Sequence, residues 1–591
     1  MNLFVAGWRP AGGPIDRAAP ERAIARLLEE LPFFPGRPVR SWAASSGLCA
    51  AAWVSHEAGV PYSCEREGSL ALFSGRPFRW TGEAEADGRG PADAGFFLQP
   101  ADGWADAIDG RFASVAYRAD DKTLEVATDP VGAYPLHEVE ADGTRWFSNS
   151  AALLRELSGQ SGFRLDSVAG LVGGGWPLDG HPIWTGLSRV EPGALIRLSR
   201  DGETRRRLLP PADVARLPGR GLDVQSAARR LAAATAALSD WPGRPAVVPV
   251  TGGRDSRVVL AAALAAGLEI EAVTGGAPDD PDVTVAERLC RIAGVPHSLL
   301  PADPHGNMWS DHRRAARIVR LTGGGTASLA DAAGFPLGPR EGPLPLWHSG
   351  QGGEIGRAYY GTGEGLDAAG ITGRLYDAFT ARRPHRRELL SAAGRDLVEG
   401  QIRGWVDARL EAGAPPADVP DLFYLERRMA NWAGPSHGCV EYVRDTTSPL
   451  WSRRVVADLL APSPDERAGV AYHRRVLDLL GPRLAQAPLA DGSGWESTPG
   501  RVAHARTLAR KAAREGARRL RARRGERAEA GADPLDPILA DVRDQVMGAE
   551  SHAAWEVLDR ERCEALLSRP VAALDEMSRY YVWRLATLFV D

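Results

Sequence analysis

The stretch AVVPVTGGRDSR at residues 246–257 constrains this chain more than any other part of its sequence. Its first five residues are apolar and rich in Val, a Gly-Gly pair follows, and an Ala- and Leu-rich run extends from Val258 to Ala266. The pattern predicts a strand, a tight loop and a helix. The glycines allow close backbone approach, Ser256 adds a hydroxyl donor, and the helix N-terminus adds about half a positive charge. We expect this loop to bind a phosphate.

The residues around this loop continue the alternation of strand and helix. A helix is expected over Gln225–Ala237, a strand over Leu268–Val273, a helix over Val283–Ala293 and a strand over Val295–Leu300. Such alternation is typical of a parallel doubly wound sheet, whose ligands bind beyond the carboxyl ends of the strands. The loop lacks the Lys of the Walker A pattern, which excludes a P-loop NTPase.

Thr251 to Ser256 resembles the PP-loop of the ATP pyrophosphatases, Ser-Gly-Gly-x-Asp-Ser, in which ATP is split between its α and β phosphates. The Thr keeps the hydroxyl of the usual first Ser. The resemblance implies ATP and Mg²⁺ as cofactors, with Asp255 as a metal ligand. The implied ATP- and pyrophosphate-binding residues are Thr251, Gly252, Gly253, Arg254, Asp255 and Ser256, together with Thr274 after the next strand. An ordinary Gly-Gly turn after a strand is the alternative.

The first two hundred residues predict a sheet-rich domain with few long helices. Short strands separated by Gly, Pro and Asp turns are expected over Asn2–Gly7, Leu70–Ser74, Phe112–Arg118, Thr123–Thr128 and Arg145–Ser148. The segments DGRFASV (109–115), DPVGAYPL (129–136) and WFSNS (146–150) resemble, in order and spacing, the glutaminase domain of class B asparagine synthetases. Residues 200–222, rich in Arg, Pro, Gly and Asp, are predicted to form a linker.

These resemblances together imply an α/β and α+β protein of two domains. Residues 1–208 are expected to form an Ntn-hydrolase-like, glutaminase-like sheet sandwich. Residues 209–591 are expected to form a PP-loop ATP pyrophosphatase domain with a doubly wound parallel sheet and a helical C-terminal region.

The chain departs from the glutaminases at its N-terminus. Those enzymes use an N-terminal Cys as nucleophile, whereas Met1 is followed here by Asn2, and the nearest Cys is Cys49. An amide cannot supply a thiolate. The domain is therefore expected to lack the N-terminal Cys nucleophile and to keep its fold as a scaffold. The same loss marks the β-lactam synthetases and the lasso-peptide macrolactam synthetases, in which the amine already belongs to the substrate.

A second chemical stretch, LPLWHSGQGGEIGR, occupies residues 344–357. It resembles the Ser-Gly-x-Gly-x-Asp loop of asparagine synthetases, whose acid shares Mg²⁺ with the PP-loop Asp. Glu354 stands at the position of that acid, which implies that Glu354 is the second metal ligand and that Gly350, Gly352 and Gly353 adjoin the nucleotide. The alternative for Glu354 is a solvated loop carboxylate.

Glu426 is the remaining candidate for a catalytic role. By the resemblance it corresponds to the carboxylate that pairs with a Tyr to deprotonate the amine in β-lactam synthetases, but Gln351 takes the place of that Tyr. An ion pair with Arg427 or a neighbouring Arg is the alternative.

Composition excludes several functional classes. A net charge of −5 argues against a general nucleic-acid binder. The five cysteines are widely spaced and odd in number, which fits a reduced cytoplasmic protein better than a disulfide or zinc framework. No stretch approaches the length of a membrane span, and no signal-peptide pattern begins the chain, so we expect a cytoplasmic location.

Three classes of function fit these features. The first is a lasso-peptide cyclase that adenylates an Asp or Glu side chain of a precursor peptide and joins it to the peptide's N-terminal amine; its expected partners are the precursor, a leader-binding protein and a leader peptidase. The second is an enzyme that acts on small molecules, either a β-lactam-synthetase-like cyclase or an asparagine synthetase-like enzyme using free ammonia. The third is a non-catalytic scaffold. The length of the chain favours the first.

Two C-terminal segments complete the sequence. Residues 501–527 are strongly basic, which indicates either a solvated arm or a docking surface for an acidic partner such as the precursor's leader. The segment Ser578–Val590 is aromatic and apolar and is predicted to pack as a closing helix.

Overall fold

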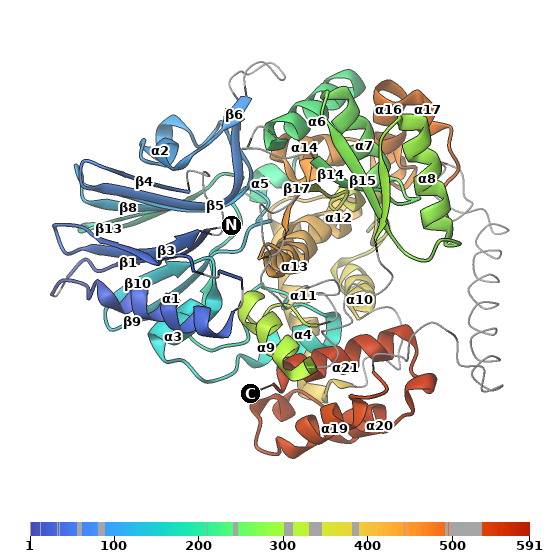
Figure 1. The fold of residues 1–591 in the computed structure, drawn as a ribbon. Helices are drawn as coiled ribbons and strands as arrows, with labels where there is room; N and C mark the ends of the chain where they lie inside the picture. The colour runs from blue at the N-terminus through green and yellow to red at the C-terminus, as the bar shows by residue number, and fades with distance from the viewer. Residues whose placement is uncertain are drawn as a thin grey trace.

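The computed structural model of the 591-residue chain describes residues 2–11, 13–31, 33–34, 36–55, 62–80, 89–209, 211–239, 241, 246–300, 311–329, 346–380, 389–442, 444–490, 495 and 535–590. These residues form a mixed α/β structure with two antiparallel sheets, one parallel sheet and many helices. Figure 1 shows the antiparallel sheets on one side of the molecule and the parallel sheet with its helices on the other. Across the described ranges, no helix has the length and apolar content needed to cross a bilayer.

The N-terminal half contains the two antiparallel sheets. The first has the order β11-β9-β10-β1-β3-β2, from β1 (Asn2–Trp8), β2 (Arg40–Ala43), β3 (Cys49–Ser55), β9 (His137–Ala141), β10 (Thr144–Ser148) and β11 (Ser188–Arg189). The second has the order β13-β12-β8-β7-β5-β4, from β4 (Ser63–Arg66), β5 (Ser69–Trp80), β7 (Ile108–Arg118), β8 (Thr123–Thr128), β12 (Ala194–Ser199) and β13 (Gly202–Arg207), with β6 (Arg89–Pro91) paired to β5.

Both faces of the first sheet are covered, which explains why β1 is buried along its whole length. Alternate side chains of a strand point to opposite faces. Leu3 and Val5 accordingly pack in the cluster that includes helix α1 (Ala18–Glu30), whereas Phe4 and Trp8 pack in the cluster between the two sheets. Helices α3 (Ala151–Ser158) and α4 (Leu165–Gly174) follow β10, and α2 (Ala94–Phe97) packs on the second sheet.

The parallel sheet has the order β16-β15-β14-β17-β18, from β14 (Ala246–Pro249), β15 (Ile270–Gly275), β16 (His297–Leu300), β17 (Leu346–His348) and β18 (Asp445–Thr447). The next two strands in sequence after β14, β15 and β16, lie on one side of it. The last two, β17 and β18, lie on its other side. The strand order therefore reverses between β14 and β17. In an open α/β sheet this reversal is where ligands bind.

The helices of the second half surround this sheet and extend below it (Figure 1). They are α5 (Pro211–Val214), α6 (Val224–Ser239), α7 (Asp255–Ala265), α8 (Pro281–Ala293), α9 (His312–Thr322), α10 (Ala368–Phe379), α11 (Ala392–Glu411), α12 (Val419–Phe423), α13 (Gly434–Val440), α14 (Arg453–Leu460), α15 (Pro464–Ala468), α16 (Ala471–Leu480), α17 (Pro482–Ala485), α19 (Leu539–Gly548), α20 (Arg560–Leu567) and α21 (Glu576–Leu588).

The predicted strands and helices are confirmed with shifted ends. The five N-terminal strands lie within β1, β5, β7, β8 and β10, the strand-loop-helix unit is β14 to α7, and the closing helix is α21. The predicted linker over residues 200–222 is wrong at its start, because β13 pairs there with β12. β13 is an exposed edge strand of sequence GETRRR, so no apolar alternation revealed it. The basic segment 501–527 lies outside the described residues.

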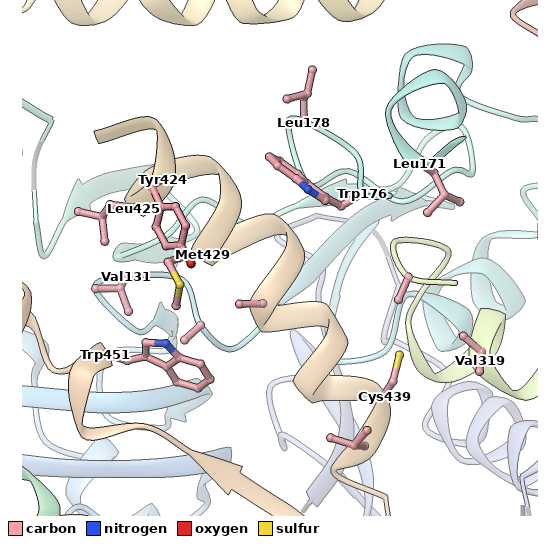
Figure 2. Packing of buried hydrophobic residues seen from close by; sticks show 14 of the residues in the cluster. Val131, Leu171, Trp176, Leu178, Val319, Tyr424, Leu425, Met429, Cys439 and Trp451 are labelled. Carbon is pink, nitrogen blue, oxygen red and sulfur yellow. The ribbon is translucent and has the colours of Figure 1, made fainter. Parts of the chain in front are cut away.

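A continuous helical segment from Tyr424 to Val440 passes through the centre of the second half. Its first part, Tyr424–Ala433, is π-helical, and α13 continues it. In Figure 2, Trp176 and Leu178 lie on one side of this segment, and Val131 and Trp451 lie on the other. The segment therefore connects the core of the second half to the antiparallel half.

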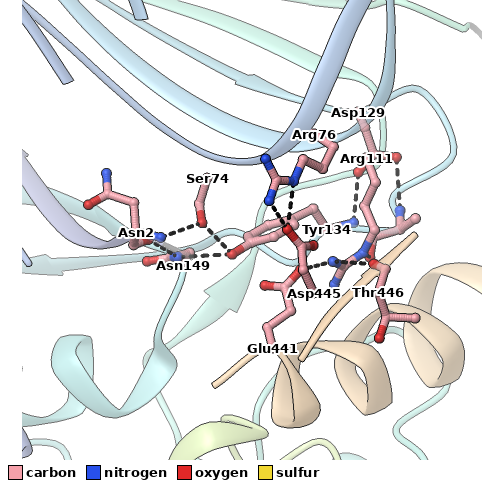
Figure 3. A network of polar contacts seen from close by, with 11 residues as sticks. Asn2, Ser74, Arg76, Arg111, Asp129, Tyr134, Asn149, Glu441, Asp445 and Thr446 are labelled. Atoms are coloured by element: carbon pink, nitrogen blue, oxygen red, sulfur yellow. Dashed lines mark hydrogen bonds and ion pairs between the residues drawn. The ribbon is translucent and has the colours of Figure 1, made fainter. Parts of the chain in front are cut away.

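Buried ion pairs join the two halves (Figure 3). Arg76 of β5 pairs with Asp445 of β18, donating from Nε at 2.6 Å, and Arg111 of β7 pairs with Glu441. Arg111 also donates to the carbonyl of Ala133 at 2.8 Å. Removing one partner of such a pair leaves the other charge buried and uncompensated. The edge of the parallel sheet is thus anchored to the second antiparallel sheet.

We expect Asp445→Asn to lower the free energy of unfolding by about 3–5 kcal/mol, because Arg76 would lose its buried counter-charge. The side chains of Arg76 and Asp445 are only 4% and 7% exposed. Denaturant titration measures the change. Glu399→Gln, which breaks the exposed Arg403–Glu399 pair of α11, is the control and should change stability far less. Equal effects of the two substitutions would contradict the role given to Asp445.

Candidate functional site

The loop between β14 and α7 is closed by its own hydrogen bonds. The Oγ of Ser256 accepts from the backbone N–H of Thr251 at 3.0 Å and lies 3.0 Å from the Thr251 hydroxyl. The N–H of Gly253 donates to Thr251 Oγ1, and the N–H of Gly252 donates to Asp282 of α8 at 2.9 Å. The loop thus presents N–H groups at the start of α7, although an incoming anion must replace the Asp282 contact.

Arg257 holds the chain segment that lies over this loop. Its guanidinium is fully buried and donates to the carbonyls of Ala487 and Pro488 at 2.7 and 2.8 Å, and burial lowers its pKa to about 10. The same segment continues to Ala490, whose N–H donates to the carbonyl of Gly252 at 3.1 Å. Arg257 is therefore structural, even though it ends the stretch that defines the loop.

The second loop, residues 349–353, meets the first at the reversal of strand order. A Cβ at Gly350 would lie 2.6 Å from the backbone nitrogen of Ser256, and a Cβ at Gly353 would overlap the Asp255 carboxylate. Real Cβ atoms do not approach other atoms so closely, so only glycine fits at both positions. The structure thereby brings the predicted residues Gly350 and Gly353 to Asp255 and Ser256, whereas Gly352 faces Trp451 and Leu450.

Asp255 and Glu354 share one guanidinium. Arg357 lies 3.3 Å from Asp255 Oδ2 and 3.6 Å from Glu354 Oε1, and His473 Nε2 of α16 lies 2.8 Å from Asp255 Oδ1. The carboxylate side chains are 16% and 23% exposed, so Glu354 is not the solvated loop residue that the sequence left open. Arg357 and His473 were not predicted. Arg357 is three residues after Glu354, but no local pattern marks His473.

The two carboxyl groups titrate in opposite directions. Burial opposes ionisation of Asp255, but Arg357 and His473 outweigh it and hold its pKa below the ordinary value. Burial raises the pKa of Glu354, and the negative charge of Asp255 raises it further. Tyr424 donates to Glu354, and burial keeps the pKa of that phenol well above 10. The neighbouring cations therefore favour ionised Asp255, whereas burial and the Asp255 charge favour the protonated form of Glu354.

Asp255 and Glu354 are the residues able to hold a divalent cation. Within the described ranges, Glu354 Oε2 is buried without a hydrogen-bond partner, and no group of three or more His, Cys, Asp or Glu side chains forms a cation site. Mg²⁺ commonly takes one or two carboxylates and completes its shell with phosphate oxygens and water. Two carboxylates beside a loop whose N–H groups lie at the start of a helix fit that preference.

Of the other predicted residues, Thr274 and Arg254 adjoin the first loop, whereas Glu426 does not. Thr274, at the end of β15, donates to the carbonyl of Val250 at 2.7 Å, and Arg254 directly precedes α7. Glu426 instead accepts from Arg409 of α11 at 2.7 Å and from Trp405, and it lines a separate cavity with Arg189. The ion-pair alternative for Glu426 is therefore observed with a neighbouring Arg, while Arg427 pairs with Asp179.

No family model and no curated protein matches this chain. Among solved structures it is similar to glutamine phosphoribosylpyrophosphate amidotransferase from B. subtilis complexed with ADP and GMP, at 12% identity over 51% of this chain and 65% of that chain, with a TM-score of 0.22. It is also similar to a structure described as the allosteric regulatory enzyme of purine biosynthesis, at 11% identity over 51% and 80% of the chains, with a TM-score of 0.23.

The chain thus spans just under two thirds of the B. subtilis amidotransferase. At TM-scores this low, neither likeness identifies a fold family.

We expect Glu354→Gln to stabilise the metal-free protein increasingly as pH rises above 4.5, the ordinary pKa of Glu. The folded state raises that pKa, so it binds the Glu354 proton more tightly than the unfolded state does. The stabilising effect of this proton is complete at low pH and is lost as pH rises through the folded-state pKa. Unfolding free energies of both proteins, measured across pH in EDTA, test this.

Glu364→Gln, a substitution at an exposed carboxylate, is the control and should show no such trend. A difference between wild type and Glu354→Gln that is constant across pH would mean that Glu354 titrates normally.

Proposed function

We propose that this chain is an ATP-dependent amide ligase that forms AMP and pyrophosphate, and that it closes a macrolactam ring in a precursor peptide of the lasso type. The observation that supports it most is the approach of Gly350 and Gly353 to Asp255 and Ser256, which joins a phosphate-binding loop to a carboxylate pair. Neither loop alone would suffice, because the phosphate and its metal need both.

The proposed reaction has two steps. An oxygen of an Asp or Glu side chain of the peptide attacks the α-phosphorus of ATP, and the bond from that phosphorus to pyrophosphate breaks. The peptide's N-terminal amine then attacks the acyl carbon, the carbon–oxygen bond to AMP breaks, and the amine loses a proton. Mg²⁺ held by Asp255 and Glu354 would supply positive charge to the phosphate oxygens.

The chain's own residues contribute binding and charge. The N–H groups at the start of α7 and the Ser256 hydroxyl bind phosphate oxygens, and Asp255 and Glu354 hold Mg²⁺. Arg357 contacts both carboxylates and lies where it can supply a further positive charge to the leaving pyrophosphate. His473 holds Asp255 from the buried side, which keeps that carboxylate ionised.

Asn2 stands where the glutaminases have their nucleophilic Cys. This supports a reaction in which the substrate itself supplies the amine. The Asn2 side chain donates to the carbonyl of Phe73 at 3.0 Å and accepts from Ser55 at 3.0 Å, so it is bonded within the sheets. Cys49 offers no replacement, because burial between the sheets raises the pKa of its thiol. The antiparallel half then serves as a support for β18.

Asp255→Ala is expected to abolish ATP-dependent pyrophosphate release with the precursor peptide while leaving the protein folded, since Asp255 is predicted to hold metal and not core. A coupled pyrophosphate assay and circular dichroism measure both properties. Asp478→Ala, at an exposed position of α16, is the matched control and should keep wild-type turnover. Pyrophosphate release by Asp255→Ala at the wild-type rate would refute the proposal.

Glutamine should not serve as nitrogen donor, because Asn2 provides no thiolate. Glutamate release from glutamine, measured alongside pyrophosphate, is expected to stay at the level of a no-enzyme blank. Glutamate formed in step with ATP use would instead favour an amidotransferase. Pyrophosphate release that needs free ammonia and no peptide would favour the asparagine synthetase-like alternative.

A further inference from the structure

A cavity of about 700 Å³ lies beside the second loop. Gln351 of the second loop lines it, as do Tyr359 and Tyr360, which follow the turn that carries Glu354. Tyr424, the hydrogen-bond donor to Glu354, packs its ring against those of Tyr359 and Tyr360 at 5.3 and 5.8 Å. The cavity and the candidate metal site therefore share a wall.

The wall of this cavity is basic. Arg428, Arg444 and Arg584 line it, and the residues described along it include no Asp or Glu. Burial lowers the pKa of Arg444, and each of the three guanidinium groups has a buried Nε without a hydrogen-bond partner in the described chain. His437 also lines the cavity, but burial drives its pKa well below 6.5, so it stays neutral. An anion with several acceptor oxygens would satisfy these donors.

The wall is also aromatic. Trp176, Tyr359, Phe379 and Trp432 line the same cavity, and the guanidinium of Arg428 lies over Trp432 at 4.3 Å from the ring centre. Such surfaces bind flat or bulky apolar groups. The cavity thus offers aromatic surface and positive charge to one ligand.

Glycines before Trp176 make room for this arrangement. Gly175 ends α4 with φ of 98°, and a Cβ there would overlap the Arg584 guanidinium. A Cβ at Gly174 would overlap the Phe379 ring in the same way. The GGGW segment at residues 173–176 therefore lets a cation and an aromatic ring reach the cavity from α21 and α10.

We propose that this cavity binds a segment of the peptide substrate in which a carboxylate neighbours an aromatic side chain. The carboxylate would be held by Arg444 and Arg584, and the aromatic group would pack on Tyr359 and Trp432. A nucleotide is disfavoured, because the phosphate-binding N–H groups lie at the start of α7. The link to amide formation rests on the proposed function, but the binding preference does not.

Isothermal titration of the full chain without ATP tests the proposal. The probes are acetyl-Asp-Phe-amide, acetyl-Asn-Phe-amide and acetyl-Asp-Ala-amide at millimolar concentration. Loss of the carboxylate or of the phenyl ring should each weaken binding about tenfold or more, which corresponds to about 1.4 kcal/mol. Arg444→Gln should remove the preference for Asp over Asn, and Arg444→Lys should restore part of it.

Arg155→Gln is the matched control, since this half-buried Arg lies over Trp184 outside the cavity. It should keep the full preference. If Arg444→Gln fails to fold by circular dichroism, Trp432→Leu replaces it and should remove the preference for Phe over Ala. Equal binding of the Asp and Asn peptides by the wild type, absence of binding, or displacement of the peptide by AMP would overturn the proposal.

Asp255→Ala separates this proposal from the proposed function. It should stop pyrophosphate release without changing peptide binding. Retained peptide preference in a wild type that releases no pyrophosphate would refute the proposed function alone, whereas pyrophosphate release with no peptide preference would refute the cavity assignment alone.

Discussion

The site depends on the contact between two loops that leave adjacent strands of the parallel sheet. β14 and β17 are neighbours, and the strand order reverses between them, so their carboxyl ends open into one crevice. Gly350 and Gly353 remove the side chains that would hold the loops apart. Asp255 and Glu354 meet as a consequence, and Arg357 balances part of their charge. Without this reversal, the two loops would not open into the same crevice.

The antiparallel half contributes to this site through β18. Arg76 and Arg111 hold Asp445 and Glu441 in a buried interface (Figure 3), and β18 continues directly into Ser448. The Ser448 hydroxyl donates to the carbonyl of Gln351 at 2.8 Å. Buried ion pairs contribute little net stability but are costly to break, so they make one arrangement of the halves much better than others. The antiparallel half thus has a physical role in positioning the second loop.

The helical segment that begins at Tyr424 links the carboxylate pair to the basic cavity. Tyr424 donates to Glu354 at one end, and further along the segment Arg428 and Trp432 line the cavity. A π-helix carries more residues per turn than an α-helix and is often found at functional sites. Here Tyr424 and Arg428 face the cavity side, whereas Glu426 turns to Arg409.

The sequence by itself determined the local units of this protein. The Val-rich run before the Gly-Gly pair predicts β14, and the apolar run after it predicts α7. The short patterns of the two loops single out Asp255 and Glu354 as candidate metal ligands. Patterns of this kind depend on neighbours in the chain. The edge strand β13 and the π-helical segment escaped prediction because one is polar on both faces and the other has no distinctive period.

Only the tertiary structure decided which of these units meet. His473 reaches Asp255 from a distant helix, and Glu426, which resembled a catalytic carboxylate, is paired with Arg409 of α11. The basic cavity combines residues from α10, α21 and the segment after Tyr424, none of which is adjacent in sequence. Long-range packing sets these contacts, and the physical reason is that a side chain's partners depend on how whole elements stack, which local spacing does not encode.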